Sequence, residues 1–255
     1  MLDEVNQLPV YVISLSNNVH RRKSLERKFK YSSTYFQYID AVNGGHLQAK
    51  EYFSSLLHLY HSQGRLMTPS EVGCALSHVE ALKVFLGSKN SHALILEDDI
   101  IGTDESIADI RNIAPKLPEN SILIAGGQDG IKSPYLLGKA SIEGTSELAE
   151  LSFDYIYRAC CYVVTRESAK LILEQQSAIL TIADWWGVIL KNTGIKIYYK
   201  SLMQHPLDLA DSNLELDRVA LSNKKDRKGF FSKELFRLIR KIKVFYLIVR
   251  GNRRL

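Results

Sequence analysis

Short apolar runs alternate along this chain with longer segments of helical periodicity. Residues 10–15 (VYVISL) form the first run, which is β-branched and has the length of a buried strand. Similar runs follow at 35–41, 92–97, 121–127, 159–165 and 195–200. Helical patterns separate several of them, at 17–29, 68–88, 166–175 and 183–192. This alternation predicts an α/β fold with a mainly parallel sheet covered by helices.

The predicted helix over 68–88 has a clear start and a clear apolar face. Pro69 stands in the first turn, where a missing backbone N–H costs nothing. The apolar positions recur at helical spacing and include Val72, Ala75, Leu76, Val79 and Leu82. His78 lies on this same helix, and its surroundings alone indicate a hydrogen-bonded core histidine.

Composition and charge divide the chain into two parts. It has 255 residues, of which 45% are hydrophobic, enough for one large α/β domain with an appendage. Residues 223–255 contain 12 Lys or Arg and two acids, a net +10, which leaves 21 bases and 26 acids, a net −5, for the rest. We therefore expect a catalytic or binding domain over 1–222 and a basic tail over 223–255.

The tail has the pattern of a basic amphipathic helix. Apolar residues follow helical spacing, and bases fill other faces. The apolar set is Phe231, Leu235, Leu238, Ile239, Ile242, Phe245, Tyr246 and Val249, and the bases include Lys233, Arg237, Arg240 and Lys241. This pattern predicts contact with an anionic membrane surface, with a helix docked on the body or on a partner as the alternative. Nucleic acid is disfavoured because the body is acidic and the tail keeps a continuous apolar stripe.

Other features of the sequence limit which cellular compartment and which cofactors we expect. Cys74, Cys160 and Cys161 form no CxxC motif and predict reduced core thiols in a cytoplasmic setting. No paired histidines at ligand spacing occur either, which argues against a zinc site. The first residues are acidic and lack the pattern of a signal peptide, and no apolar window reaches the roughly 18 residues of a membrane span. We expect a protein that is neither secreted nor integral to a membrane.

Three consecutive acids, Glu97, Asp98 and Asp99, follow the predicted strand at 92–97. Ligands of open α/β sheets gather at the carboxyl ends of strands. Alternate side chains of an extended segment face the same way, so Glu97 and Asp99 are expected to converge while Asp98 points elsewhere. Two such carboxylates suit Mg²⁺ or Mn²⁺. The alternative is a solvated strand end with one Asp capping the next helix.

Several other candidates have simple structural alternatives. Arg21, Arg22 and Lys23 follow the first predicted strand and are either a phosphate contact or a solvated helix face. Trp185 and Trp186 are core or groove walls, although an aromatic ring beside Asp184 would also stack on a sugar. The sequence contains no P-loop, no GxGxxG fingerprint and no GxSxG nucleophile elbow.

Taken in order, several fragments resemble glycosyltransferase family 25. They are VYVISLSNNVHRR, IDAVNGG, MTPSEVGCALSHVEAL, ALILEDDI and CCYVVTRESAKLIL, and the similarity covers roughly residues 9–215. The resemblance implies a GT-A-like fold that binds a nucleotide sugar. It also favours the metal interpretation of the acid triplet.

The resemblance further implies roles for individual residues. Glu97 and Asp99, with Asp98 beside them, match a DXD-type site for Mn²⁺ or Mg²⁺, and His205 is a late histidine expected near that metal. Residues expected near the donor nucleotide are Ser14, Leu15, Arg21, Arg22, Glu71, Gly73, Ser77, His78 and Asp98. Asp184 matches a downstream acid near the acceptor, and we take it as the catalytic base because it stands apart from the metal set.

The implied reaction is an inverting transfer of a hexose, galactose first, from a UDP-sugar to a lipooligosaccharide or lipopolysaccharide acceptor. The expected location is the inner face of a bacterial cytoplasmic membrane, with the lipid-linked acceptor as partner. Two alternatives stay open at this point. One keeps the fold with UDP-glucose or a UDP-N-acetylhexosamine as donor, and the other is a non-catalytic module that binds membrane or nucleic acid through the tail.

Overall fold

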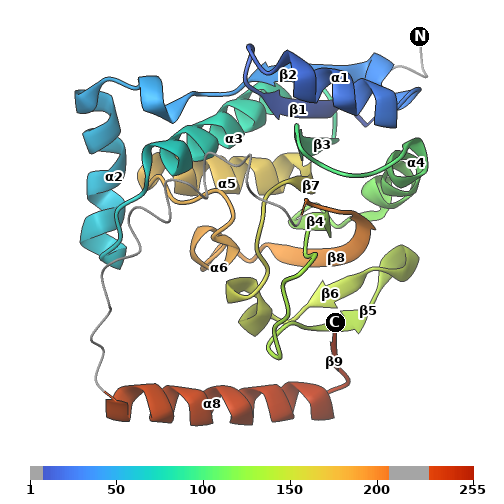
Figure 1. The fold of residues 1–255 in the computed structure, drawn as a ribbon. Helices are drawn as coiled ribbons and strands as arrows, with labels where there is room; N and C mark the ends of the chain where they lie inside the picture. The colour runs from blue at the N-terminus through green and yellow to red at the C-terminus, as the bar shows by residue number, and fades with distance from the viewer. Residues whose placement is uncertain (1–7, 207–229) are drawn as a thin grey trace.

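The computed structural model describes the backbone of residues 8–206 and 230–255, and the side chains of 8–206 and 239–255. In this part of the chain, nine strands form a single sheet with helices against it (Figure 1). The strand order is β2-β1-β3-β7-β4-β8-β6-β5-β9.

The strands and helices follow one another in a mixed order. The strands are β1 (Val10–Ser14), β2 (Phe36–Asp40), β3 (His92–Glu97), β4 (Ser121–Gly126), β5 (Leu137–Ala140), β6 (Ser146–Leu148), β7 (Cys161–Thr165), β8 (Lys196–Met203) and β9 (Arg253–Arg254). The helices are α1 (Val19–Lys28), α2 (Ala49–Gln63), α3 (Pro69–Gly87), α4 (Asp104–Ile113), α5 (Arg166–Ala178), α6 (Trp186–Ile189) and α8 (Phe230–Val249).

The α/β class is confirmed, but the sheet is mixed instead of mainly parallel. β1 pairs in parallel with β2 and β3, and β4 pairs in parallel with β8. β7 lies between β3 and β4 and is antiparallel to both. β5, β6 and β9 add further antiparallel pairs at the other edge. An apolar run shows that a strand is buried but carries no sign of its direction, which is set by where the preceding loop enters the sheet.

The central strands are buried on both faces, which explains their continuous apolar runs. All five residues of β1 are buried, and the four apolar ones alternate between two hydrophobic clusters. Tyr11 and Ile13 pack on one side of the sheet, and Val10 and Val12 pack on the other. The sheet is therefore a middle layer, and its strand ends are its accessible edges.

The predicted helices at 17–29, 68–88 and 166–175 are confirmed as α1, α3 and α5. Thr68 and Glu71 form a reciprocal capping box at the start of α3, with Pro69 in the first turn as expected. The helix predicted at 183–192 shrinks to the single turn of α6.

α2, α4 and the short strands β5, β6 and β9 were missed. The sequence did carry a signal for α4, because Thr103 caps it and Ile107, Ile110 and Ile113 form a buried face at helical spacing. The three strands have only two to four residues each, too few for a period to show.

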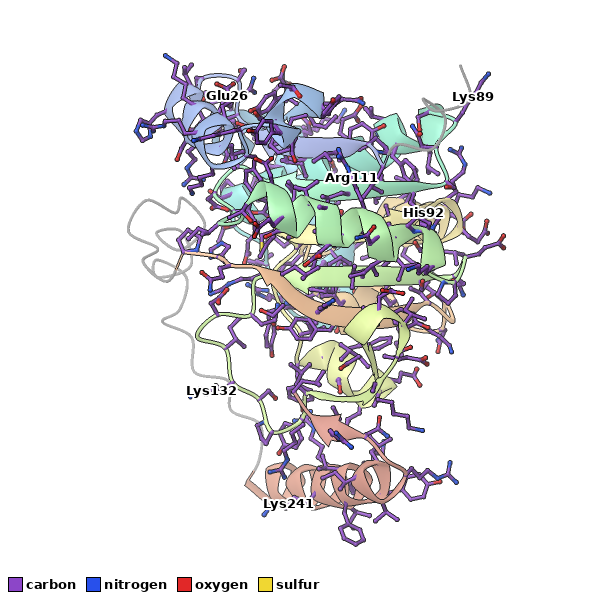
Figure 2. All side chains as sticks on the ribbon, turned by 90° about the vertical axis from the view of Figure 1, so that its right-hand side faces the viewer. Glu26, Lys89, His92, Arg111, Lys132 and Lys241 are labelled. Carbon is purple, nitrogen blue, oxygen red and sulfur yellow. The ribbon has the colours of Figure 1, made fainter. Side chains whose placement is uncertain are left out.

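The C-terminal segment forms the predicted helix and also contacts the body. Val244 of α8 is buried, and the Arg240 guanidinium lies 5.6 Å from the ring centroid of Tyr155. After the helix, β9 pairs with β5, and the backbone N–H of Leu255 donates to the carbonyl of Leu136 at 3.1 Å. Figure 2 shows Lys241 of α8 at the opposite end of the molecule from Glu26 of α1.

Part of the tail prediction lies outside the described residues. The expected boundary at 222/223 falls in the range 207–229, and the side chains of Phe231, Lys233, Leu235, Arg237 and Leu238 are likewise not described. Of the helices within the described ranges, none has the length and apolar character needed to cross a membrane.

Candidate functional site

A cavity of about 600 Å³ opens at the carboxyl ends of β1 and β3. These neighbouring parallel strands end together, with Ile13 of β1 in register with Glu97 of β3. Cavities of about 300–1,000 Å³ are typical of small-molecule sites. Nine residues predicted from the sequence line this one, namely Ser14, Leu15, Arg21, Ser77, His78, Glu97, Asp98, Asp99 and His205.

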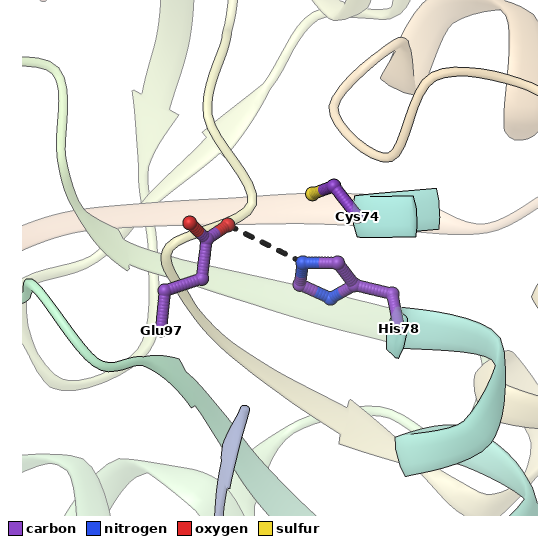
Figure 3. Close-up of side chains that lie close together, drawn as sticks. All are labelled: Cys74, His78 and Glu97. Atoms are coloured by element: carbon purple, nitrogen blue, oxygen red, sulfur yellow. Dashed lines mark hydrogen bonds and ion pairs between the residues drawn. The ribbon is translucent and has the colours of Figure 1, made fainter. Parts of the chain in front are cut away.

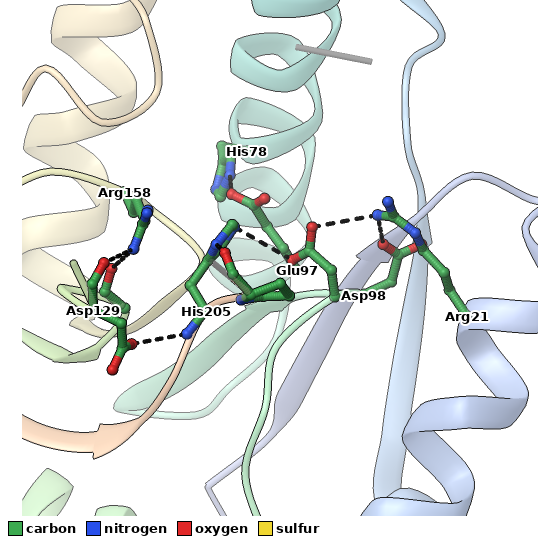
Figure 4. A network of polar contacts seen from close by, with 10 residues as sticks. Arg21, His78, Glu97, Asp98, Asp129, Arg158 and His205 are labelled. Atoms are coloured by element: carbon green, nitrogen blue, oxygen red, sulfur yellow. Dashed lines mark hydrogen bonds and ion pairs between the residues drawn. The ribbon is translucent and has the colours of Figure 1, made fainter. Parts of the chain in front are cut away.

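Asp98 connects the acidic segment to the first strand and helix (Figure 4). Its carboxylate accepts hydrogen bonds from Ser14 Oγ at 2.8 Å, Arg21 Nη1 at 2.9 Å and Asn18 Nδ2 at 3.3 Å. The residue is 8% exposed. A buried carboxylate with three donors is well satisfied, so Asp98 anchors the loop and leaves the other two acids to face different partners.

Asp99 is the acid with unmet bonding capacity. Arg21 Nη1 donates to its Oδ2 at 3.3 Å, and His205 Nε2 lies 3.9 Å from its Oδ1. Oδ1 is buried and has no hydrogen-bond partner. Burial, reinforced by the charge of Glu97, raises the pKa of Asp99 to about 6. The folded chain thus holds a carboxylate whose charge its own groups only partly compensate.

His205 is oriented toward this acid by its own backbone. Its Nδ1 lies 2.8 Å from the carbonyl oxygen of Pro206, which only accepts, so Nδ1 carries the proton there. In the neutral form of this tautomer, Nε2 has a lone pair on the side of Asp99. A neutral imidazole fixed in this way is a typical metal ligand.

Glu97 faces helix α3. Its Oε1 lies 3.3 Å from His78 Nε2, and His78 Nδ1 lies 3.0 Å from the hydroxyl of Tyr162. Burial acts to raise the pKa of Glu97, but the hydrogen bond and charge of His78, with His205 and Arg21 beside them, hold it below its usual value. The sequence indicated a core histidine at 78, and the structure shows one that is buried and also lines the cavity.

Helix α3 forms one wall of the cavity because small residues let a loop approach it. A Cβ on Gly73 would lie 2.5 Å from the carbonyl oxygen of Val42, so only glycine allows this contact. Ser77 Oγ accepts from the Val42 backbone N–H at 2.8 Å and donates to the Gly73 carbonyl at 2.7 Å. Gly73 and Ser77 therefore position the loop after β2 rather than offer polar atoms of their own to a ligand.

Four predicted site residues do not line the cavity, namely Gly73, whose role is to admit the loop after β2, and Arg22, Glu71 and Asp184. Arg22 donates to Ser14 Oγ and to the Ser14 carbonyl at 3.1 and 3.0 Å, so it stabilises the end of β1. Glu71 is buried in the capping box of α3, where Arg65 pairs with it at 2.8 Å. Asp184 lies apart from the lining residues, and its Oδ2 accepts the backbone N–H of Arg158 at 2.9 Å.

Asp184 is nevertheless connected to the cavity through Arg158, because Arg158, Asp129 and His205 form a short polar network (Figure 4). The Arg158 guanidinium donates to the carbonyls of Gly127 and Asp129 at 2.6 and 2.9 Å. The Asp129 carboxylate in turn accepts the backbone N–H of His205 at 3.0 Å. The contacts thus run from Asp184 through Arg158 and Asp129 to His205.

Sequence reasoning missed several lining residues. On α1, His20, Ser24 and Lys28 follow one another at i, i+4 and i+8 and all line the cavity, as does Asn18 before the helix. That spacing was visible as a polar face running along the helix away from the first strand. Cys74 of α3 also lines the cavity, four residues before His78, whereas Cys160 and Cys161 are buried as predicted.

The chemistry of these groups fits a divalent cation. Asp99 and Glu97 offer carboxylate oxygens, and His205 offers an imidazole nitrogen, the donor types that Mn²⁺ and Mg²⁺ accept. The partnerless Oδ1 of Asp99 is the observation in favour, since a cation would satisfy it.

Comparison with known proteins places the chain in one family. The family model of glycosyltransferase family 25 (LPS biosynthesis protein) matches residues 7–186. The chain belongs to glycosyltransferase family 25. Two curated proteins are similar to this chain.

A glycosyltransferase 25 family member of Anopheles gambiae is 25% identical over 213 residues, covering 74% of this chain and 33% of that protein. A Haemophilus influenzae protein with glycosyltransferase in its name is 32% identical over 92 residues, covering 35% and 32%. The matches thus span about a third of each relative's length.

Solved structures overlap only loosely with this glycosyltransferase family 25 chain. A mannose-1-phosphate geranyltransferase from Thermus thermophilus is 10% identical with a TM-score of 0.40, covering 76% of this chain and 75% of that one. An inositol-1-phosphate CTP transferase from T. maritima is 11% identical with a TM-score of 0.38, covering 83% and 94%. Overlaps this loose carry no argument about the site.

The opposite environments of Asp98 and Asp99 predict opposite effects on stability. A pKa of about 6 for Asp99 exceeds the unfolded value, so this group makes the free energy of unfolding fall as pH rises from about 4 to above 6. Without divalent cations, Asp99→Asn should be more stable than the wild type near pH 7.5, by about 1–3 kcal/mol, and lose that advantage near pH 4.

Asp98→Asn is the matched control for this prediction. It should lower stability at neutral pH, by about 1–3 kcal/mol, because the carboxylate accepts three hydrogen bonds. Urea unfolding of both variants in chelator, at the two pH values, measures the difference. A loss of stability for Asp99→Asn at both pH values would contradict the strained environment of that acid.

Proposed function

We propose that this protein transfers a hexose, galactose in the first instance, from a UDP-sugar to a lipopolysaccharide or lipooligosaccharide acceptor, with inversion and with a requirement for Mn²⁺ or Mg²⁺. One observation carries the proposal. In a chain of glycosyltransferase family 25, the acid triplet opens into a cavity at the ends of β1 and β3, and Asp99 Oδ1 is partnerless there.

Different residues of the cavity would have different roles in binding the donor. Asp99, Glu97 and His205 are the residues that would hold the divalent cation. When bound, that cation offsets negative charge on the diphosphate leaving group. Lys28 lines the same cavity and adds positive charge from α1, and the His20 imidazole also belongs to the lining, while Asp98 and Arg21 fix the loop on which the acids sit.

The acceptor hydroxyl needs a base if the anomeric centre inverts in one displacement. Asp184 is the residue that we propose for this role. It is separate from the cation ligands, and its Oδ2 is oriented by the Arg158 N–H. Because Asp184 lies beyond the cavity lining, the acceptor would bind next to the donor cavity and not inside it.

Release of UDP from UDP-galactose, with Mn²⁺ and a deacylated lipooligosaccharide acceptor, tests the proposed reaction. Asp99→Asn should lower the rate by at least about 100-fold, because a first cation ligand is lost. It should also abolish the Mn²⁺-dependent part of UDP binding, measured by calorimetry. A panel with UDP-glucose and UDP-N-acetylhexosamines identifies the donor. Unchanged UDP binding by the variant would overturn the cation assignment.

Removal of the proposed base should affect turnover and spare the donor. Asp184→Asn keeps an acceptor for the Arg158 N–H, so we expect kcat to fall by about 100- to 10,000-fold while the Kd for UDP with Mn²⁺ stays constant. Asp129→Asn, in the same network, is the control and should have the smaller effect on kcat. Full transfer by Asp184→Asn would exclude it as the base.

The tail adds a proposed partner, an anionic membrane surface. α8 contacts the body through Val244 and Arg240, while its far face is exposed. That face carries Ile239, Ile242, Phe245, Tyr246 and Val249, which are 41–70% exposed and recur at helical spacing. A docked helix and a membrane-facing helix are thus compatible, because the two contacts use different faces.

Basic residues surround this apolar face. Lys241 and Lys243 belong to the same helix, Arg250 directly follows it, and Arg253 and Arg254 lie in β9; all five are exposed. Each cation near an anionic surface contributes roughly 1 kcal/mol of attraction. An apolar stripe flanked by cations is the pattern of a helix that lies in the plane of a membrane interface.

Sedimentation with lipid vesicles tests the membrane proposal. The double variant Ile242→Glu/Phe245→Glu should bind phosphatidylglycerol vesicles at least about tenfold more weakly than the wild type, because two exposed apolar side chains are lost from the interface. Phe53→Glu/Leu57→Glu on α2 is the control, since those residues are similarly exposed, at 56% and 48%. Equal binding by all three proteins would contradict a membrane role for α8.

A further inference from the structure

Cys74 and His78, to which the proposed transfer reaction gives no role, form a cluster with Glu97 (Figure 3). Cys74 and His78 lie one turn apart on α3, and Glu97 ends β3. The thiol sulfur, the imidazole nitrogen and the carboxylate oxygen all lie within 4.8 Å of one another. In the described part of the chain, this is the group of three that meets the spacing of a metal site.

The surroundings of His78 prepare it to bind a metal through Nε2. Its Nδ1 contacts the Tyr162 hydroxyl at 3.0 Å, so one ring nitrogen already has an outer partner. Nε2 points at Glu97, 3.3 Å away. A ligand histidine whose second nitrogen is fixed by a hydrogen bond is the usual arrangement around protein-bound zinc. The three side chains also come from a capped helix and a buried strand, which hold them in place.

The donor set favours a different ion from the one proposed above. A thiolate and an imidazole are soft or intermediate ligands, and they prefer Zn²⁺ over Mn²⁺ or Mg²⁺. Tetrahedral zinc places its donors about 3.3–3.8 Å apart, so small side-chain rotations of Cys74 and Glu97 would close the site. The sequence argued against zinc for want of CxxC or paired histidines, but the fold supplies the third ligand from another element.

The other two thiols are unsuited to this role. Cys160 and Cys161 are each 1% exposed, and burial raises the pKa of both thiols well above the usual range. Cys74 is only partly buried and lines the cavity together with His78 and Glu97. A metal ion therefore has a path to all three ligands, and a fourth position faces the cavity.

We propose that Cys74, His78 and Glu97 bind Zn²⁺ in the wall of the cavity, and that this ion inhibits the enzyme. Inhibition rests on the proposed function, because Glu97 would serve both the zinc site and the catalytic cation site. On binding, Cys74 loses its thiol proton to solvent. His78 Nε2 also gives up to solvent any proton that it carries, and the one proton of the metal-bound ring is on Nδ1, which donates to the Tyr162 hydroxyl oxygen.

Titration with Co²⁺ tests the site independently of activity. Full-length protein should bind one equivalent of Co²⁺ with a thiolate-to-cobalt charge-transfer band, and Zn²⁺ should remove the band. Cys74→Ala should lose it. Cys161→Ala and Asp99→Asn should keep it, since neither residue belongs to the cluster. A band that survives in Cys74→Ala, or no band in the wild type, would overturn the proposal.

Alkylation of the wild type gives a second measurement that needs no variant. Iodoacetamide should modify Cys74 in the metal-free protein, located by peptide mass spectrometry, and Zn²⁺ should slow this reaction at least about tenfold, because the metal-bound sulfur is blocked. Mn²⁺ should leave the rate unchanged. Equal protection by both ions, or protection by neither, would contradict a zinc site.

The inhibition has its own test in the UDP-release assay with saturating Mn²⁺. Zn²⁺ should inhibit the wild type, and Cys74→Ala should need at least about tenfold more Zn²⁺ for the same inhibition. If the protein releases no UDP at all, the proposed function fails while the cobalt band still decides the zinc site. If Zn²⁺ inhibits both proteins equally, the site does not regulate the enzyme.

Discussion

The carboxylate of Asp98 determines how the whole acidic segment is arranged. It accepts hydrogen bonds from Ser14, Asn18 and Arg21, all in the first βα unit, so the end of β3 is attached to the end of β1. With the middle acid held in this way, Glu97 and Asp99 turn to other partners at the cavity. Three adjacent carboxylates remain compatible with folding because each has a different environment.

This arrangement leaves the ionised carboxylate of Asp99 in an unfavourable environment. Asp98 is satisfied by donors, and Glu97 is compensated by His78, but Asp99 has a buried oxygen without a partner and a pKa raised to about 6. Functional sites commonly keep groups of this kind, because a ligand supplies the missing interaction. Under the proposed function, the stability that the chain gives up at this carboxylate would be recovered when a cation binds.

Around this segment, most of the residues that matter act by positioning. Gly73 and Ser77 bring the loop after β2 against α3, and Arg22 stabilises the end of β1. The Glu71 side chain accepts the backbone N–H of Thr68 and so caps the start of α3. The motif that identifies the family in the sequence therefore contains both ligand-facing groups, such as His78 and Cys74, and groups that only shape the wall. A motif alone does not separate the two kinds.

Much of the fold follows from local pattern. Runs such as 10–15 and 121–127 are apolar throughout because both sheet faces are covered, and α3 has a capping box and Pro69 that define its start. The acid triplet could be recognised as a candidate site because it directly follows a strand. The amphipathic C-terminal helix was equally visible from its spacing.

Contacts between distant segments depended on the tertiary structure. The antiparallel course of β7, the pairing of β9 with β5 and the approach of His205 to Asp99 all join residues far apart in the chain. For the same reason, Arg22, Glu71 and Asp184 proved to bind other protein groups instead of lining the cavity. The period of apolar residues shows which side of a helix or strand is buried, because burial depends on the polarity of each side chain. The residue that a buried side chain contacts depends on strand direction and on the path of the loops. Both are decided only when the whole chain packs together.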